Sequence, residues 1–322
     1  MATSLKKSYI CILNEYNNPK QMASVKSWIS ALRPRTLFLA VATSLCGSGI
    51  AYSTGNFSIP VLILTASIAT ILQLLSNMAN DLGDYQHGTD ITGERVGPKR
   101  TVQSGVITPQ QMKNAIKIAI GAATIVGVLL IYIALQFMEL KYILIFLVLG
   151  AACIVAAIKY TAGKNPYGYK GLGDIFSFTF FGPVSVVGTY FLHTHTVDFR
   201  AWLPAIALGF LTVCVLNLNN MRDMENDRKS GKITIPVRIG YRNAKLYHAF
   251  LTLGALACFI AYSVMYTSHW YQYLYLLSFV IFIKLLADIF NTTENRLLDP
   301  YLKYTSMGSF VLSVFFCICI NL

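Results

Sequence analysis

The chain has 322 residues, of which 55% are hydrophobic and 12% are charged, and its formal net charge at pH 7 is +12. A composition this apolar excludes an ordinary soluble enzyme and predicts a membrane protein. Long uncharged stretches recur along the whole chain, and no Pro- or Ser-rich linker separates them. We therefore expect one polytopic domain rather than a soluble domain with a single anchor.

The first 35 residues contain no long apolar core and no small-residue cleavage site, so a removable signal peptide is not expected. Val25, Trp28 and Leu32 recur at helical spacing near the end of this segment. The spacing predicts either a short helix in the membrane interface or an extension of the first membrane helix. We assign 1–35 to a cytoplasmic or interfacial segment and 36–322 to the membrane domain.

Nine apolar stretches are long enough to cross a hydrocarbon core of about 30 Å as helices. They do not alternate as barrel strands do, and lipid does not tolerate unpaired backbone groups, so we expect helices. The predicted fold is all-α, with nine transmembrane helices in one bundle around a central apolar cavity. The expected spans are 36–54, 59–80, 114–137, 141–160, 173–192, 201–221, 244–266, 270–290 and 302–321.

The distribution of basic residues predicts the orientation of these spans. The N-terminal segment and the loops after spans two, four, six and eight share one side, which holds all 26 Lys and Arg residues except Lys141 and Arg200. The positive-inside rule places this side in the cytoplasm and Leu322 outside. The net charge therefore indicates topology and attraction to anionic lipid, not nucleic-acid binding. We expect an integral protein of the bacterial inner (cell) membrane.

The first acidic cluster lies where span two ends, in the stretch NMANDLGDYQHGTD. Asn77, Asp81 and Asp84 are spaced at i, i+4 and i+7, so they share one face if the helix continues. Asn80 lies beside them, and Asp90 follows in the loop.

A second acidic cluster follows span six, in the stretch NLNNMRDMENDRKSGK. Asn219, Asp223 and Asp227 fall at i, i+4 and i+8, which again predicts one helical face. Both clusters are followed by Gly and basic residues, in GERVGPKR after the first and in DRKSGK after the second. A repeat four helices apart suggests two related halves whose loops meet over a shared cavity.

Carboxylates from two helix ends, with basic residues beside them, are typical of a site for a divalent cation and a phosphate. Mg²⁺ takes oxygen ligands, and Lys and Arg hold the remaining phosphate oxygens. An apolar bundle behind such a site would hold a long hydrocarbon tail, so we expect a polyprenyl diphosphate as ligand. A single acidic cluster would more simply be a solvated loop, and buried acids also mark ion-coupled transporters, although transport sites usually lie near the bilayer midplane.

The loop YTAGKNPYGYKGLGD, residues 160–174, mixes aromatic and basic residues with several Gly and Pro breaks. The composition predicts a bent lid whose side chains either hold an anionic aromatic acceptor or form an interfacial aromatic belt. The candidate acceptor-loop residues are Tyr160, Lys164, Tyr169 and Asp174.

These motifs resemble those of the intramembrane aromatic prenyltransferases of the UbiA superfamily. Further resemblance lies in LRPRTL at 32–37, GPKRTVQSG at 97–105, the loop at 160–174, and NNMRDMENDRKSGKITIPVRIG at 219–240. The first motif has DxxDxxxxxD spacing, whereas ubiquinone-type members usually have a closer third Asp. This departure favours the naphthoate branch of the superfamily.

The resemblance implies Mg²⁺-dependent transfer of a polyprenyl group from polyprenyl diphosphate to 1,4-dihydroxy-2-naphthoate, with release of diphosphate and CO₂, to give demethylmenaquinone. Alternative acceptors are 4-hydroxybenzoate and those of the haem and chlorophyll enzymes of the superfamily. Membrane lipid is the expected surrounding, and the acid–base group is not identifiable. The implied metal-site residues are Asp81, Asp84, Asp223, Asp227, Asn77, Asn80, Asn219 and Asp90. The implied diphosphate-binding residues are Lys99, Lys232, Arg33, Arg100 and Arg228, each of which could instead be a topology-setting charge.

Overall fold

The computed structural model describes residues 23–88 and 100–322. Two of the candidate site residues, Asp90 and Lys99, lie outside the described residues. Within the described part, the chain is helical and has no strand, which confirms the predicted fold class. Nine candidate membrane spans occur in this part: Val25–Ser53, Ile59–Gln86, Pro109–Leu135, Leu140–Lys159, Gly173–Thr194, Phe199–Arg222, Tyr241–Tyr266, Trp270–Asn291 and Asn295–Ile320.

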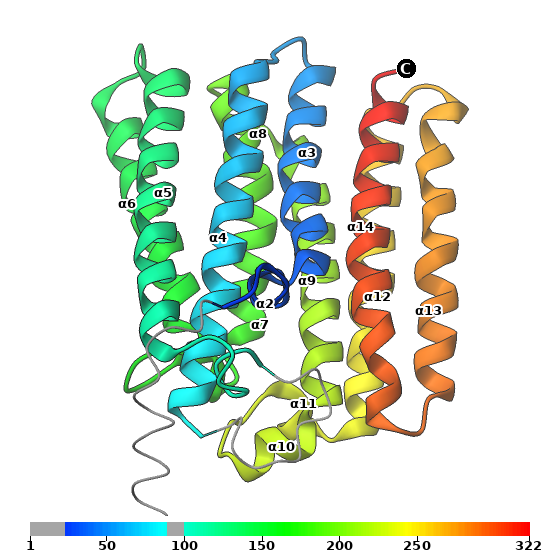
Figure 1. Ribbon diagram of the computed structural model, residues 1–322. Helices are drawn as coiled ribbons and strands as arrows, with labels where there is room; N and C mark the ends of the chain where they lie inside the picture. The colour runs from blue at the N-terminus through cyan, green and yellow to red at the C-terminus, as the bar shows by residue number, and fades with distance from the viewer. Residues whose placement is uncertain (1–22, 89–99) are drawn as a thin grey trace, which may run out of the picture.

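The spans lie side by side in one bundle, and the short helices α10 and α11 gather at the end opposite the C-terminus (Figure 1). The protein is an integral membrane protein, and its orientation in the membrane stays a prediction. The elements in chain order are α2 (Val25–Leu32), η1 (Pro34–Thr36), α3 (Leu37–Ser53), α4 (Ile59–Gln86), α5 (Pro109–Leu135), α6 (Leu140–Lys159), η2 (Tyr167–Lys170), α7 (Gly173–Thr179), η3 (Phe180–Val187), α8 (Gly188–Thr194), η4 (Phe199–Ala201), α9 (Trp202–Arg222), α10 (Met224–Lys229), α11 (Ile235–Ile239), α12 (Tyr241–Tyr266), η5 (Trp270–Ser278), α13 (Phe279–Asn291), η6 (Asn295–Leu298) and α14 (Asp299–Ile320).

The N-terminal helix α2 is separate from the membrane helix α3. It ends at Leu32; the next residue, Arg33, has a left-handed φ of 49°, and Pro34 follows. Proline lacks the N–H that would continue the helix, so the chain turns here before it enters α3. One face of α2 packs on α4 through Trp28 and Ala31, while Val25 is exposed. The first candidate span, Val25–Ser53, is thus divided by a turn into the short helix α2 and the longer helix α3.

Helix α4 continues past the expected end of span two and carries Asp81 and Asp84 on its last turns. The second acidic cluster differs, because α9 ends at Arg222 and a new helix, α10, begins at Met224. Asp223 lies at this junction, so the expected single helical face of Asn219, Asp223 and Asp227 is divided between two helices. The break turns α10 across the end of the bundle.

The fifth span is not one regular helix. Its middle part, η3, has the wider turns of a π-helix, and Pro183 lies inside it. Proline removes one backbone donor, and such irregular turns often occur at functional sites. The tightly packed core lies on the other side of the bundle, where α3, α9, α12 and α14 bury residues such as Leu208, Phe259 and Phe316. This division leaves room for a cavity among α4, α5, α6 and η3.

Candidate functional site

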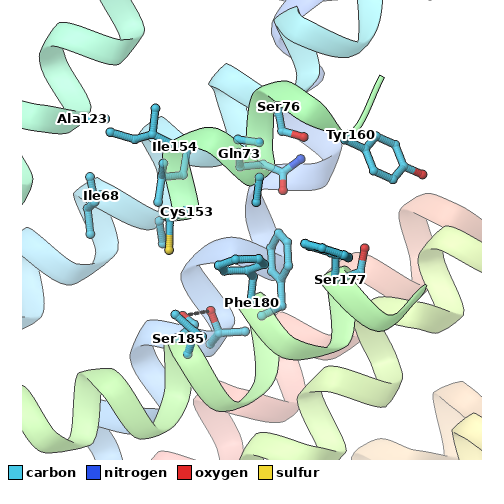
Figure 2. Close-up of a pocket in the computed structure, with 18 of the residues that line it drawn as sticks. Ile68, Gln73, Ser76, Ala123, Cys153, Ile154, Tyr160, Ser177, Phe180 and Ser185 are labelled. Carbon is cyan, nitrogen blue, oxygen red and sulfur yellow. Dashed lines mark hydrogen bonds between the residues drawn. The ribbon is translucent and has the colours of Figure 1, made fainter. Parts of the chain in front are cut away.

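A cavity of about 580 Å³ opens inside the bundle. Its charged end is lined by Asp84, Arg100 and Lys232, and the rest of its wall is mainly apolar. Figure 2 shows side chains from several elements around it, including Gln73 from α4, Cys153 from α6 and Phe180 from η3. The predicted combination of a charged mouth and an apolar interior is therefore present in one continuous space.

Asp84 is the carboxylate of the first acidic cluster that lies on the cavity wall. Its side chain is buried, and it pairs with the guanidinium of Arg100. The hydroxyl of Tyr169 donates a hydrogen bond of 2.9 Å to its Oδ1 atom. The ammonium of Lys232 lies 5.7 Å from the ring centroid of the same tyrosine. Tyr169 therefore connects the first acidic cluster, the 160–174 loop and the lysine that follows the second cluster.

Asp227 is the corresponding carboxylate of the second cluster. Its Oδ1 atom lies 3.5 Å from Nζ of Lys232, whereas its buried Oδ2 atom has no hydrogen-bond partner in the described part of the chain. Burial raises the pKa of Asp227 to about 6, Lys232 opposes this shift, and the charges of Asp223 and Asp84 add to it. Burial also disfavours the charged form of Lys232, but Asp227 and Asp84 outweigh it and raise the lysine pKa. One charged lysine thus interacts with a carboxylate from each half of the bundle.

These residues fit a Mg²⁺ ion that binds together with a phosphate. Within residues 23–88 and 100–322, no group of three or more His, Cys, Asp or Glu side chains could hold an ion by itself. Mg²⁺ is commonly bound by one or two carboxylates, with waters and substrate phosphate oxygens completing the shell. Asp84 and Asp227 could supply those carboxylates, and the unpartnered Oδ2 atom of Asp227 is a suitable hard ligand.

Asp81 makes different contacts. Its Oδ2 atom accepts hydrogen bonds from the Thr101 hydroxyl at 2.6 Å and the Thr101 backbone N–H at 3.2 Å, and its Oδ1 accepts one from Val102 N–H at 3.4 Å. These bonds hold Thr101 and Val102 against α4. They therefore place the preceding residue, Arg100, against Asp84.

Replacing Thr101 with Val is expected to destabilise the protein, because the buried carboxylate of Asp81 loses its shortest hydrogen bond. The expected loss in free energy of unfolding is about 1–3 kcal/mol. It would appear as a lower midpoint of thermal unfolding in detergent. The matched control is Thr196→Val in an exposed loop, which should leave the midpoint unchanged. Equal midpoints for the two variants would contradict the role assigned to the Asp81–Thr101 bond.

Asp223 is held by Arg222 in a two-pronged ion pair, with distances of 2.9 Å from Nε to Oδ1 and 2.7 Å from Nη2 to Oδ2. Nη1 of Arg222 also lies 2.5 Å from Oδ1 of Asp299 on α14, and Asp299 pairs with Arg35 at 3.0 Å. Asn219 accepts a further bond of 2.9 Å from Arg222. This network joins α9, α14 and η1.

Arg222→Gln is expected to be strongly destabilising, because it leaves two carboxylates without their shared cation. Removing one partner of a buried ion pair typically costs about 3–5 kcal/mol. Arg200→Gln is the control, since its pair with Asp198 is one-third exposed and such pairs contribute at most about 1 kcal/mol. Thermal unfolding of both variants in detergent tests this difference, and similar losses would contradict it.

The asparagines of the first cluster contact neighbouring segments. Asn77 donates to Leu32 O at 2.8 Å and to the Thr36 hydroxyl at 3.0 Å, and accepts from Gln73 at 3.0 Å. It therefore fastens the turn around Arg33 to α4. Oδ1 of Asn80 accepts a bond of 3.0 Å from Thr161, which joins α4 to the 160–174 loop.

The remaining candidate residues for binding diphosphate or the acceptor differ in how far their side chains are exposed. Arg33 and Tyr160 line the cavity, whereas Arg228 and Lys164 are exposed. Burial raises the pKa of Tyr160, and Asp174, Asp84 and Asp227 raise it further, so this phenol stays protonated. Asp174 is buried and accepts a hydrogen bond of 3.1 Å from Tyr247.

Sequence reasoning missed three residues of this site: Arg222, Thr101 and Asp299. Arg222 lies inside the second motif, but nothing in the motif separates it from the other basic residues nearby. Asp299 lies on α14, far along the chain, so no local pattern indicates its contact with α9.

Comparison with known proteins gives concordant matches. A model of the UbiA prenyltransferase family matches residues 40–307. The 1,4-dihydroxy-2-naphthoate octaprenyltransferase of Escherichia coli (strain K12) is 39% identical over 303 residues, which cover 94% of this chain and 97% of that protein. The protein of the same name from Haemophilus influenzae is 40% identical over 294 residues, which cover 91% and 94%.

Two solved structures share the fold at low sequence identity. A UbiA homolog from Aeropyrum pernix K1 superposes with a TM-score of 0.67 and 16% identity, over 88% of this chain and 97% of that one. A UbiA homolog from Archaeoglobus fulgidus, bound to GPP and Mg²⁺, superposes with a TM-score of 0.66 and 15% identity, over 92% and 100%. From the extent of these matches, this chain is a membrane-embedded transferase that belongs to the UbiA prenyltransferase family.

Proposed function

We propose that the protein transfers a polyprenyl group from polyprenyl diphosphate to 1,4-dihydroxy-2-naphthoate in a Mg²⁺-dependent reaction, which releases diphosphate and CO₂ and yields the quinol form of demethylmenaquinone for menaquinone synthesis. One observation carries the proposal: a single cavity joins a charged end, with Asp84 and Lys232, to a long apolar interior. The acceptor is supported by relatives named 1,4-dihydroxy-2-naphthoate octaprenyltransferase. An ion-coupled transporter, the other function considered from the sequence, is not supported, because the chain belongs to a family of prenyltransferases.

The charged end of the cavity suits the diphosphate of the donor. Lys232, Arg100 and Arg33 line this end and would contact phosphate oxygens, and Arg does so with two parallel donors. Asp84 and Asp227 would hold Mg²⁺, which when bound supplies positive charge that stabilises the departing diphosphate. Asp81 and Asp223 are also proposed as metal ligands. In their present contacts, Asp81 binds Thr101 and so positions Arg100, whereas Asp223 binds Arg222 and so positions the start of α10.

The apolar wall favours prenyl transfer over hydrolysis by keeping water away from the allylic carbon. Breaking the C1–O bond leaves positive charge on the prenyl group, which water would otherwise capture. Aromatic rings of Tyr160, Phe176 and Phe180 line the cavity and can stabilise a cation through their faces. Figure 2 shows Tyr160 and Phe180 on separate parts of the wall.

The acceptor is proposed to enter beside the 160–174 loop. Its electron-rich ring carbon attacks C1 of the prenyl group, and the new C–C bond replaces the C1–O bond to diphosphate. When the carboxylate on that carbon leaves as CO₂, the electron pair of its bond returns to the ring and restores aromaticity. No base is then required to remove a proton from this carbon.

An assay with two acceptors tests the proposal. The purified protein in lipid nanodiscs receives Mg²⁺, labelled prenyl diphosphate, and either carboxyl-labelled dihydroxynaphthoate or 4-hydroxybenzoate. We expect a prenylated, decarboxylated product and labelled CO₂ only with the naphthoate. Product from 4-hydroxybenzoate alone would reject the proposed acceptor while leaving the family assignment intact.

A further inference from the structure

The side-chain amide of Gln73, on α4, is held in one orientation at the wall of the cavity. Gln73 lines the cavity, and its Nε2 atom donates hydrogen bonds to Oδ1 of Asn77 at 3.0 Å and to the Thr36 hydroxyl at 3.3 Å. Asn77 cannot be turned around, because its own Nδ2 atom donates to the backbone carbonyl of Leu32 at 2.8 Å, and a carbonyl only accepts. Asn77 therefore presents its oxygen to Gln73, which has to present its nitrogen in return.

The carbonyl oxygen of the same amide is available to a ligand. Within residues 23–88 and 100–322, Oε1 of Gln73 accepts no hydrogen bond, and the side chain is only half-buried because it borders the cavity. The contacts that join Gln73 to η1 and to its own helix use the NH₂ group alone, so they do not account for this oxygen. A carbonyl oxygen accepts hydrogen bonds but never donates them, so its partner has to carry an O–H or N–H group.

Gln73 lies where the cavity-facing side of α4 changes from apolar to polar. Ile68 precedes it on this wall, and Ser76 and Asp84 follow. In the view of Figure 2, Gln73 lies between Ile68 and Tyr160. The rise of an α-helix places Gln73 about 16 Å from Asp84 along the helix axis. This interval has room for the diphosphate, the reacting C1 atom and an aromatic ring in line, so Oε1 lies where a ring that attacks C1 would extend.

Of the two substrates, only the aromatic acceptor has a hydrogen to donate at this place. An ionised diphosphate has acceptor oxygens only, and the prenyl chain has no polar hydrogen. The 1-hydroxyl of the acceptor lies beside its carboxylate and donates to it within the molecule, whereas the 4-hydroxyl has no such neighbour. We propose that Oε1 of Gln73 accepts a hydrogen bond from the 4-hydroxyl of 1,4-dihydroxy-2-naphthoate, which positions the ring against C1 and makes Gln73 a specificity-determining residue. This inference rests on the proposed function.

The same contact disfavours 4-hydroxybenzoate. In both acceptors, a hydroxyl activates the ring carbon next to it. When the two molecules are aligned by this hydroxyl, the opposite position of the ring carries the 4-hydroxyl in dihydroxynaphthoate but the carboxylate in hydroxybenzoate. A carboxylate has no hydrogen to donate, so two acceptor oxygens would face each other. A repulsive contact of this kind contributes to specificity in addition to the attractive one.

The test removes either side of the proposed hydrogen bond. Wild type and Gln73→Met are assayed in nanodiscs under nitrogen, with saturating geranyl diphosphate and either dihydroxynaphthoate or 1-hydroxy-2-naphthoate, which lacks only the 4-hydroxyl. The intrinsic reactivities of the two rings are the same in both enzymes, so a change in the ratio of their kcat/KM values isolates the contact with Gln73. We expect the ratio of dihydroxynaphthoate to the analogue to fall by roughly 5- to 150-fold in Gln73→Met, the range for leaving one buried polar group unpaired.

The ratio separates recognition of the acceptor from a purely structural role. If Gln73 only joined α4 to η1, its substitution would lower both rates alike and leave the ratio unchanged, which would overturn the inference. The matched control is Thr70→Val, also on α4. In the described part of the chain, Thr70 is not among the cavity-lining residues, and its hydroxyl donates to Ala66 O of its own helix at 2.8 Å. The ratio in this variant should equal that of the wild type.

Binding to the wild type gives a second measurement that needs no variant. Titration calorimetry with Mg²⁺ and geranyl S-thiolodiphosphate, which ionises very slowly, compares the affinities for dihydroxynaphthoate and 1-hydroxy-2-naphthoate. Dihydroxynaphthoate should bind roughly 5- to 150-fold more tightly, and equal affinities would overturn the inference. If the wild type forms no product from dihydroxynaphthoate, the proposed function itself fails, whereas product formation with an unchanged ratio contradicts only the role of Gln73.

Discussion

Asp227→Asn is expected to reduce prenyl transfer by at least about 100-fold in kcat/KM, more than the 10–100-fold typical of losing a residue that only supports a metal ligand. The substitution keeps the size of the side chain but removes its charge. The buried Oδ2 atom, which has no hydrogen-bond partner in the described structure, would no longer be an anionic ligand. The measurement is the initial rate with saturating Mg²⁺ and labelled geranyl diphosphate.

The control for this substitution lies two residues away. Glu225 is also on α10 and also acidic, but it is exposed, so Glu225→Gln should retain wild-type activity. Both variants should show similar thermal midpoints, which would exclude misfolding as the cause. If Asp227→Asn were as active as Glu225→Gln, Asp227 would not be part of the site.

Lys232→Met is the second substitution with a large expected effect. The lysine is buried at the charged end of the cavity and lies close to Asp227 and the Tyr169 ring. Its loss removes a phosphate donor and removes the cation that pairs with Asp227, while Asp84 keeps its pair with Arg100. Removing one donor that stabilises developing negative charge typically lowers kcat by about 10²–10³-fold.

Lys229→Met, which removes an exposed lysine from the end of α10, is the matched control. We expect it to behave like the wild type in steady-state kinetics with varied prenyl diphosphate. The contrary result, a similar loss in both lysine variants, would mean that the effect comes from the net charge of this surface rather than from contact with the diphosphate.

Much of the fold was predictable because membrane spans are determined by long apolar stretches. Asp84 and Asp227 were predictable as well, since each lies in an acidic cluster at the end of a helix and both clusters fall on the same side of the bundle. The structure brings them to a common lysine, Lys232. Tyr169 also meets this group, as the aromatic composition of its loop suggested.

Other features depend on contacts that a local pattern does not contain. The break between α9 and α10 turns Asp227 inwards and leaves Arg228 exposed, so spacing along one helix was misleading for the second cluster. Arg222 reaches Asp299 on α14, a partner set by tertiary packing.

The central claim is that carboxylates from both halves of the bundle and Mg²⁺ act together to bind the prenyl diphosphate. Equilibrium binding of labelled geranyl diphosphate to the purified wild type, Asp84→Asn and Asp227→Asn, with Mg²⁺ or with EDTA, tests it most directly. We predict that the wild type binds only with Mg²⁺ and that each single variant loses this Mg²⁺-dependent binding. Binding that persists in EDTA, or that survives either substitution unchanged, would contradict the account.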